Sequence, residues 1–168
     1  DEPIVQIKNT HNGTTAGELR FVMDKGAAGA DGDDLGTISF FGDDSGQNQT
    51  AFAKIVGEVS ETDDSDEAGK LSFFVAESDG TNTALTAGLV LEGEHATDGE
   101  VDVTIGAGAG SLTSFAGDLS LAHDGAIINF GADSEVTLTH VHDTGLSLND
   151  NLTITTADND PQLTLIST

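Results

Sequence analysis

The sequence predicts an all-β chain, and three observations lead to this expectation. Apolar and polar side chains alternate in short runs along nearly the whole chain, as in half-buried strands. These runs are bounded by Gly, Asp, Asn and Ser, and the 168 residues include 21 Gly but only 2 Pro. Helical spacing is nowhere sustained, because the best candidate, residues 83–91, is short and is interrupted by Gly88.

Residues 1–98 are predicted to form a β module that has the longer connections and most of the phenylalanines. A self-contained sandwich is an alternative for this part. The expected sets of inward-facing side chains, in chain order, are Leu19, Phe21 and Met23; Ile38 and Phe40; Ala53, Ile55 and Val59 around Gly57; Leu71, Phe73 and Val75; and Leu89 and Leu91.

Residues 99–168 are predicted to form a repetitive shaft of shorter strands at tighter spacing. Their turns, such as 124–125 and 149–151, contain Asp-Gly or Asn, which tolerate the positive φ of tight reversals. The expected sets of inward-facing side chains are Val101, Val103 and Ile105; Leu119 and Leu121; Ile128 and Phe130; Val136 and Leu138; Leu146 and Leu148; Leu152 and Ile154; and Leu163 and Leu165.

The two ends of the sequence resemble one another. Residues 1–10 align without gaps on residues 159–168, and the chain's two prolines, Pro3 and Pro161, occupy equivalent positions after an acidic residue. This match predicts that residues 159–168 open a further repeat and that the chain is about one unit of an array.

Each predicted strand buries few side chains, which argues for association between chains. Full burial of one large apolar side chain stabilises by about 1.5–3 kcal/mol, whereas ordering one residue costs roughly 1–2 kcal/mol of backbone entropy. A core shared between chains increases burial without adding residues, and closing the sheets around an axis removes exposed edges. We therefore expect a homo-oligomer, in the form of a β-prism or β-helix-like fibre.

The charge of the chain restricts its partners. With 30 Asp and Glu against 5 Lys and Arg, the formal net charge is -25, which repels nucleic-acid phosphates and anionic lipids. We expect no nucleic-acid or membrane partner, and no apolar run approaches the ~20 residues of a membrane-spanning helix. The absence of Cys excludes disulfides and thiolate metal sites.

Two stretches of short β motifs stand out in the sequence. The first comprises residues 36–44, 52–59 and 67–73, and the second comprises 124–133 and 136–142. These stretches resemble tail-fibre and virion-fibre proteins of marine and cyanobacterial phages. The resemblance implies a homotrimer with a structural or host-contacting role, located in the extracellular virion. Its partners would be other fibre or virion proteins and, for a host-contacting segment, a surface glycan.

His140 and His142 are the candidate metal ligands. In an alternating strand they continue the face of Val136 and Leu138, and three such strands around an axis would bring six imidazoles together. Six nitrogen ligands suit an octahedral divalent transition metal, and His-x-His strands hold metal ions in some of the trimeric phage fibres that this segment resembles. The alternatives are imidazoles that face solvent beside Asp143 or form hydrogen bonds with their neighbours.

No catalytic residues or cofactor-binding residues are assigned, and we expect no enzymatic activity. Carboxylate pairs such as Glu92 and Glu94 are uninformative among 30 acidic residues, and the chain has no Trp or Tyr on which a sugar could stack. The acidic clusters at 31–34 and 63–67 fit neither the EF-hand spacing nor a nonapeptide calcium repeat, which favours solvated turns. The Gly-rich segment 106–111 is expected to be a loop, because no βαβ unit surrounds it.

The leading hypothesis is therefore a structural segment of a phage tail or virion fibre that spans distance. One alternative is a receptor-binding module of a fibre, with the loops at 24–36 and 60–69 as its contact surface. A second alternative is the subunit of a bacterial or archaeal extracellular filament, in which the matched ends reflect head-to-tail assembly.

Overall fold

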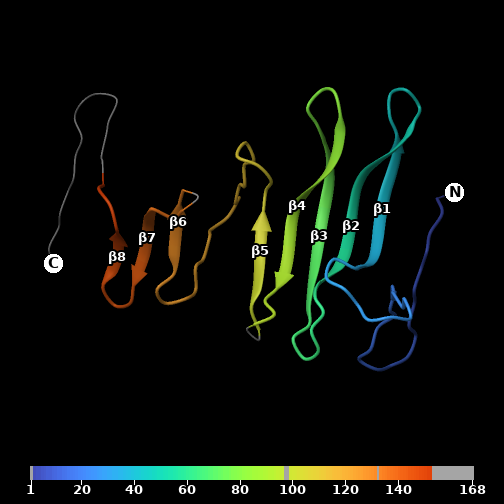
Figure 1. Ribbon diagram of the computed structural model, residues 1–168, viewed down its shortest axis with the longest axis horizontal. Coiled ribbons are helices and arrows are strands. Elements are labelled where there is room, and N and C mark those ends of the chain that lie inside the picture. The colour runs from blue at the N-terminus through green and yellow to red at the C-terminus, as the bar shows by residue number, and fades with distance from the viewer. Residues whose placement is uncertain (1, 97–98, 132, 153–168) are drawn as a thin grey trace. The chain divides into compact units, whose positions relative to one another are not determined.

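The computed structural model describes residues 2–96, 99–131 and 133–152 (Figure 1). Within these residues the chain is all-β and has no helix, as predicted. The described residues thus include no helix long and apolar enough to cross a membrane. The chain divides into two compact units, Asp1–Ser114 and Phe115–Thr168.

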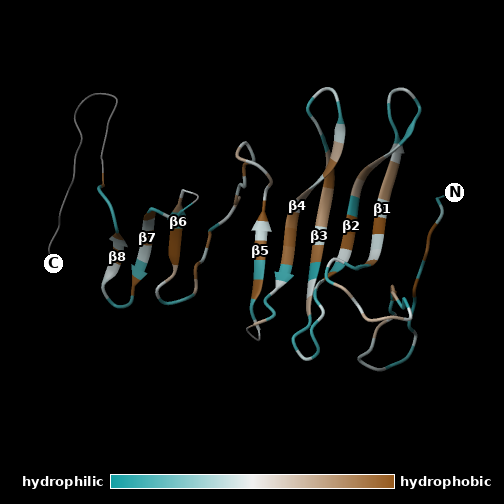
Figure 2. Ribbon diagram, viewed as in Figure 1, coloured by the Kyte–Doolittle hydropathy of each residue, from teal (hydrophilic) through white to brown (hydrophobic). Residues whose placement is uncertain are grey.

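The first unit contains one five-stranded antiparallel sheet in which every strand pairs with its neighbour in sequence. Polar turns join the strands, and the hydrophobic colour follows the strands between them (Figure 2). In sheet order the strands are β1 (Asp34–Asp43), β2 (Gln49–Glu61), β3 (Ala68–Ser78), β4 (Thr83–Gly93) and β5 (Val101–Ile105).

The sheet includes β5, a strand that the sequence had assigned to the second part of the chain. Leu89 on β4 pairs with Ile105 on β5, and Leu91 pairs with Val103. The described residues of this unit form one sheet rather than the two facing sheets of a sandwich. Among the described residues of this unit, no second sheet covers either face.

The second unit contains a three-stranded antiparallel sheet of shorter strands in the order β6-β7-β8. Its turns adopt the positive φ that their residues tolerate: φ is 80° at Gly125 and 56° at Asp143. The strands are β6 (Ile127–Phe130), β7 (Val136–Val141) and β8 (Gly145–Leu148).

Two predicted strands are wrong, those at Leu19–Met23 and around Leu119 and Leu121, because both segments are irregular. Alternation describes which side chains face a surface, but a strand also needs a partner strand for its backbone hydrogen bonds. Leu152 likewise lies outside any strand. The sets at 154 and at 163 and 165, together with the match between 159–168 and the chain's start, lie outside the described residues.

The first sheet has almost no core of its own. Val56 is the one buried hydrophobic residue among those described, with 5% of its surface exposed. It pairs across β2 and β3 with Ser72, which is also buried. In a single-layer sheet a side chain is buried only where longer side chains on neighbouring strands cover it. The other apolar residues of the sheet therefore stay exposed to solvent.

The turn between β1 and β2 is held by the carboxylate of Asp44. It accepts hydrogen bonds from the backbone N–H of Asn48 at 2.9 Å, the Asn48 side-chain amide at 3.1 Å and the backbone N–H of Gly46 at 2.7 Å. These bonds, those from Asn48 first, hold the pKa of Asp44 below its usual value. The carboxylate therefore stabilises the fold fully above its unfolded pKa of about 3.9, and this contribution is lost as the pH falls through the folded value.

We expect Asp44→Ala to lower the urea midpoint of unfolding at pH 7 and to lower it less, or not at all, near pH 2. The physical reason is that the protonated carboxyl of the parent protein has already lost most of this stabilisation at low pH. Asp43→Ala changes the charge equally at the neighbouring position and is the control. Equal effects of Asp44→Ala at both pH values would contradict the assignment.

Candidate functional site

The strand register places most of the large apolar residues of β1 to β5 on one side of the sheet, here called the apolar face. Residues directly opposite in an antiparallel pair share a face, and alternate residues along a strand share it too. Over residues 36–40, 53–59, 69–75, 89–93 and 101–105 this face has no Asp, Glu, Lys or Arg, whereas Glu77 continues it beyond Val75 at one end. Its members are Ile38, Phe40, Ala53, Ile55, Val59, Leu71, Phe73, Val75, Leu89, Leu91, Val101, Val103 and Ile105, together with Gly36, Gly57, Gly69 and Gly93.

The opposite face is polar and is covered by its own side chains. Lys54 lies over the ring of Phe74, with its Nζ 4.4 Å from the ring centre. Lys70 forms an ion pair with Glu58. These two cross-strand pairs lie on either side of Val56 in the register, which accounts for the burial of that residue.

The apolar face is open. Phe40, Val75 and Ile105 expose 52%, 56% and 51% of their surface respectively. Apolar patches beyond a few hundred Å² mark interaction sites on soluble proteins, so this face is the candidate functional site.

Two features of the apolar face are a continuous row of large side chains and, beside it, a hollow lined partly by glycines. The row, here called the ridge, contributes one residue from each strand: Ile38, Ile55, Phe73, Leu89 and Ile105. The hollow, here called the furrow, is a groove of about 390 Å³ with Gly57, Gly69 and Gly93 among its lining residues. Its other lining residues are Leu35, Leu71, Leu91 and Val101, together with Glu58 and Lys70.

The irregular N-terminal segment covers the β1 end of this face. Leu19 and Phe21 lie across a groove of about 330 Å³ from Ile38 and Leu71. A Cβ on Gly36 would lie 2.6 Å from the Cβ of Phe21, so glycine is required there for the segment to approach β1. The alternation of Leu19 and Phe21 therefore reflects contact with the sheet rather than a strand.

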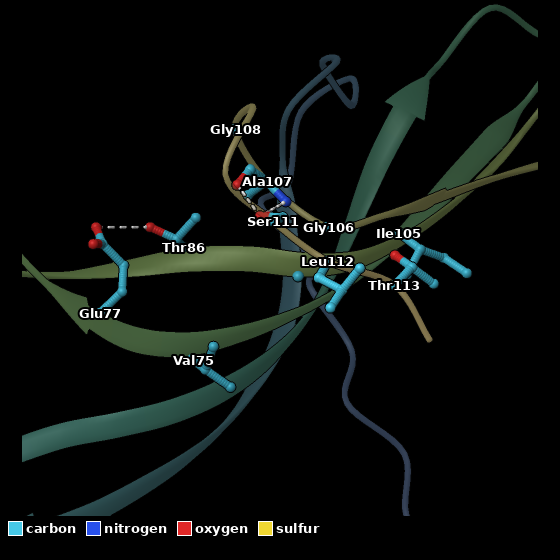
Figure 3. A pocket seen from close by; sticks show the side chains of 11 residues that line it. Val75, Glu77, Thr86, Ile105, Gly106, Ala107, Gly108, Ser111, Leu112 and Thr113 are labelled. Carbon is cyan, nitrogen blue, oxygen red and sulfur yellow. Dashed lines mark hydrogen bonds between the residues drawn. The ribbon is translucent and has the colours of Figure 1, made fainter. Parts of the chain in front are cut away.

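The Gly-rich segment 106–111 is a loop, as expected, and a hollow of about 830 Å³ lies between it and the sheet (Figure 3). Gly106 has φ of 91°, and its N–H donates to the carbonyl of Gly88 at 2.9 Å. Leu112 faces this hollow together with Val75 and Ile105, which also belong to the apolar face. The hollow thus extends the apolar face beyond the end of β5.

The predicted metal ligands lie in the second unit and differ in position. His140 is half-buried within β7, whereas His142 is exposed just after the strand ends at Val141. His142 Nδ1 lies 3.2 Å from a carboxylate oxygen of Asp124, and its Nε2 lies 3.2 Å from one of Asp143. These contacts fit the alternative in which the imidazole pairs with its neighbours. A metal shared between chains stays a prediction.

The two loops considered for receptor contact lie together. Thr62 Oγ1 donates a hydrogen bond to Asp31 at 3.0 Å, and Lys25 forms an ion pair with Asp33 at 2.6 Å. The ion pair and the backbone N–H of Ala30 lower the pKa of Asp33. Within the residues that the structure describes, no three His, Asp or Glu side chains are placed to hold a metal ion.

Sequence reasoning identified the alternating residues of the face but missed its furrow. Glycine inside a strand pattern signals a bulge or the close approach of another group, and Gly57 carried that signal within the run of Ala53, Ile55 and Val59. Gly69 and Gly93 carried no such signal, because each lies near the end of its strand. No protein-family model matches the chain, and no curated protein matches it either.

Proposed function

We propose that this chain is a structural segment of a homo-oligomeric phage tail or virion fibre, assembled as a trimer. The observation that carries the proposal is the combination of an open apolar face with a single buried hydrophobic residue among those described. A protein with so little internal core gains its stability from surface buried against other chains.

The mechanism is mechanical. The apolar faces of the copies supply a shared core, while the polar face and the turns point outward. The formal net charge of -25 per chain then surrounds the assembly with carboxylates that repel other fibres. Such a segment spans distance without needing a catalytic or cofactor site.

The meander of neighbouring antiparallel strands supports this role. Each strand of the first sheet pairs with the next in sequence, so the sheet forms from local contacts and can assemble before the copies associate. Its outer strands, β1 and β5, leave backbone groups exposed at two edges, which assembly around an axis would cover.

Light scattering on the purified chain tests the oligomer. We expect a mass of three chains, which is three times 17.1 kDa or about 51 kDa. A mass of one chain at micromolar concentration would rule out the proposal. Electron microscopy of the source particles, with antibodies against this chain, would then distinguish a virion fibre from a cellular filament, which forms open-ended filaments without capsids.

A further inference from the structure

The three glycines of the furrow are not explained by the fold of a single chain. Glycine inside a strand destabilises by roughly 0.5–1 kcal/mol relative to alanine, so its presence needs a reason. None of Gly57, Gly69 and Gly93 has a positive φ. A Cβ added to Gly57 would meet no atom within 4 Å, and at Gly69 and Gly93 the nearest atoms would lie at 3.9 and 3.8 Å.

Gly36 shows the contrasting case on the same face. A Cβ there would clash with Phe21 of the same chain at 2.6 Å, so the intrachain contact accounts for that glycine. At Gly57, Gly69 and Gly93 no atom of the same chain lies close enough to exclude a Cβ. Bare backbone in a strand is also used where another molecule approaches closely, and this reading fits the furrow.

The face restricts the chemistry of the group that fills the furrow. The lining of the furrow is mostly apolar, and its two charged residues, Glu58 and Lys70, form an ion pair with each other. A charged or strongly polar group placed there would therefore lose its hydration without compensation. The filling group is therefore a row of large apolar side chains. The ridge of Ile38, Ile55, Phe73, Leu89 and Ile105 is such a row, and it crosses the same five strands as the furrow.

We propose that the furrow of one copy receives the ridge of another copy of this chain, so that the apolar faces of β1 to β5 form the interface of the oligomer. This inference rests on the proposed function. Because the ridge and the furrow both run across the strands of one face, the contact can repeat from copy to copy around a ring of three.

The area of the apolar face can be compared with what an oligomer needs. Its members span about six residues on each of five strands, which at about 4.8 Å between strands and 3.3 Å per residue is roughly 480 Å² of flat area per copy. Two such faces give roughly 950 Å², and the hollow beside residues 106–111 extends them towards the range of stable protein interfaces, about 1200–2000 Å². Contact through uncharged faces also keeps the acidic surfaces of two copies, each with a formal charge of -25, away from the interface.

Gly57→Val tests the proposal, because filling the furrow should favour the strand in a single chain but weaken the association of the oligomer. In a single chain the new side chain meets open space and favours a strand. We expect the folded chain to keep its circular-dichroism spectrum while the dissociation constant of the oligomer, from light scattering over a dilution series, rises at least tenfold. Thr37→Val, on the opposite face of β1, is the control and should leave association unchanged.

A labelling experiment tests the same face without altering the furrow. The chain has no cysteine, so Val103→Cys and Thr104→Cys each provide a single thiol on opposite faces of β5. Both positions are exposed in the single chain. In the oligomer we expect maleimide to react at least tenfold more slowly at position 103 than at 104, and equally fast at both after dilution into monomers.

The outcomes separate this inference from the proposed function. An oligomer that keeps its dissociation constant in Gly57→Val and labels equally at both positions would overturn the interface and leave the oligomeric fibre standing. A parent protein that is monomeric at every concentration would overturn both. Slow labelling at position 103 with weakened association of Gly57→Val supports the interface.

Discussion

Replacing Phe73 with aspartate is expected to dissociate the oligomer into single chains. Phe73 is the central residue of the ridge and pairs with Ile55 on one side and Leu89 on the other. In the proposed interface a carboxylate at this position would be buried without a partner, which costs about 3–5 kcal/mol. The dissociation constant should therefore rise roughly a hundred- to several thousand-fold.

The matched control for this change is Ser39→Asp. It adds the same charge on the opposite, polar face of β1, so it tests whether charge alone weakens association. Sedimentation or light scattering over a dilution series measures both variants, and circular dichroism confirms that each chain remains folded. Equal weakening by both substitutions would contradict a specific role for the apolar face.

Low ionic strength is expected to weaken the same assembly. Each chain carries a formal charge of -25, and the Debye length grows from about 3 Å in 1 M salt to about 30 Å in 0.01 M salt. Repulsion between copies is then felt across the whole assembly, whereas contact between the uncharged apolar faces does not depend on screening. We expect the dissociation constant to rise at least about tenfold on this transfer, which corresponds to about 1.4 kcal/mol.

A dilution series followed by light scattering in 0.01 M and 1 M sodium chloride measures this effect. Repeating it with potassium chloride controls for binding of one particular cation, because screening depends on ionic strength rather than on ion identity. An assembly that becomes tighter at low salt would mean that opposite charges meet across the interface. That result would contradict contact through the apolar faces.

The sequence predicted the strands of the first sheet well where alternation coincided with a neighbouring partner. The runs around Ile38, Ile55 and Phe73 are all strands, because each has a similar run one turn away with which to pair. The equally regular run from Leu19 to Met23 is not a strand, since its apolar side chains rest against the sheet without joining its hydrogen bonds. The alternation of apolar and polar residues indicates which surface each residue faces. It does not show whether a neighbouring strand is available for backbone hydrogen bonds.

The surroundings of the two predicted metal ligands could not be predicted from the sequence. His140 and His142 share a face only if the strand continues through both, and in the structure β7 ends at Val141. His142 then lies near Asp124, which precedes β6, a proximity that depends on how the strands of the second sheet pair. The contact is therefore set by the fold and not by the spacing of the two histidines.

By itself, the sequence determined that this protein is all-β, acidic and short of internal core, because alternation, charge and the number of large apolar side chains are properties of the chain. Only the tertiary structure decided that β5 joins the first sheet and that Gly57, Gly69 and Gly93 line one furrow beside one ridge. These facts depend on strand register, and a shift of one residue in the pairing would send every side chain of a strand to the opposite face.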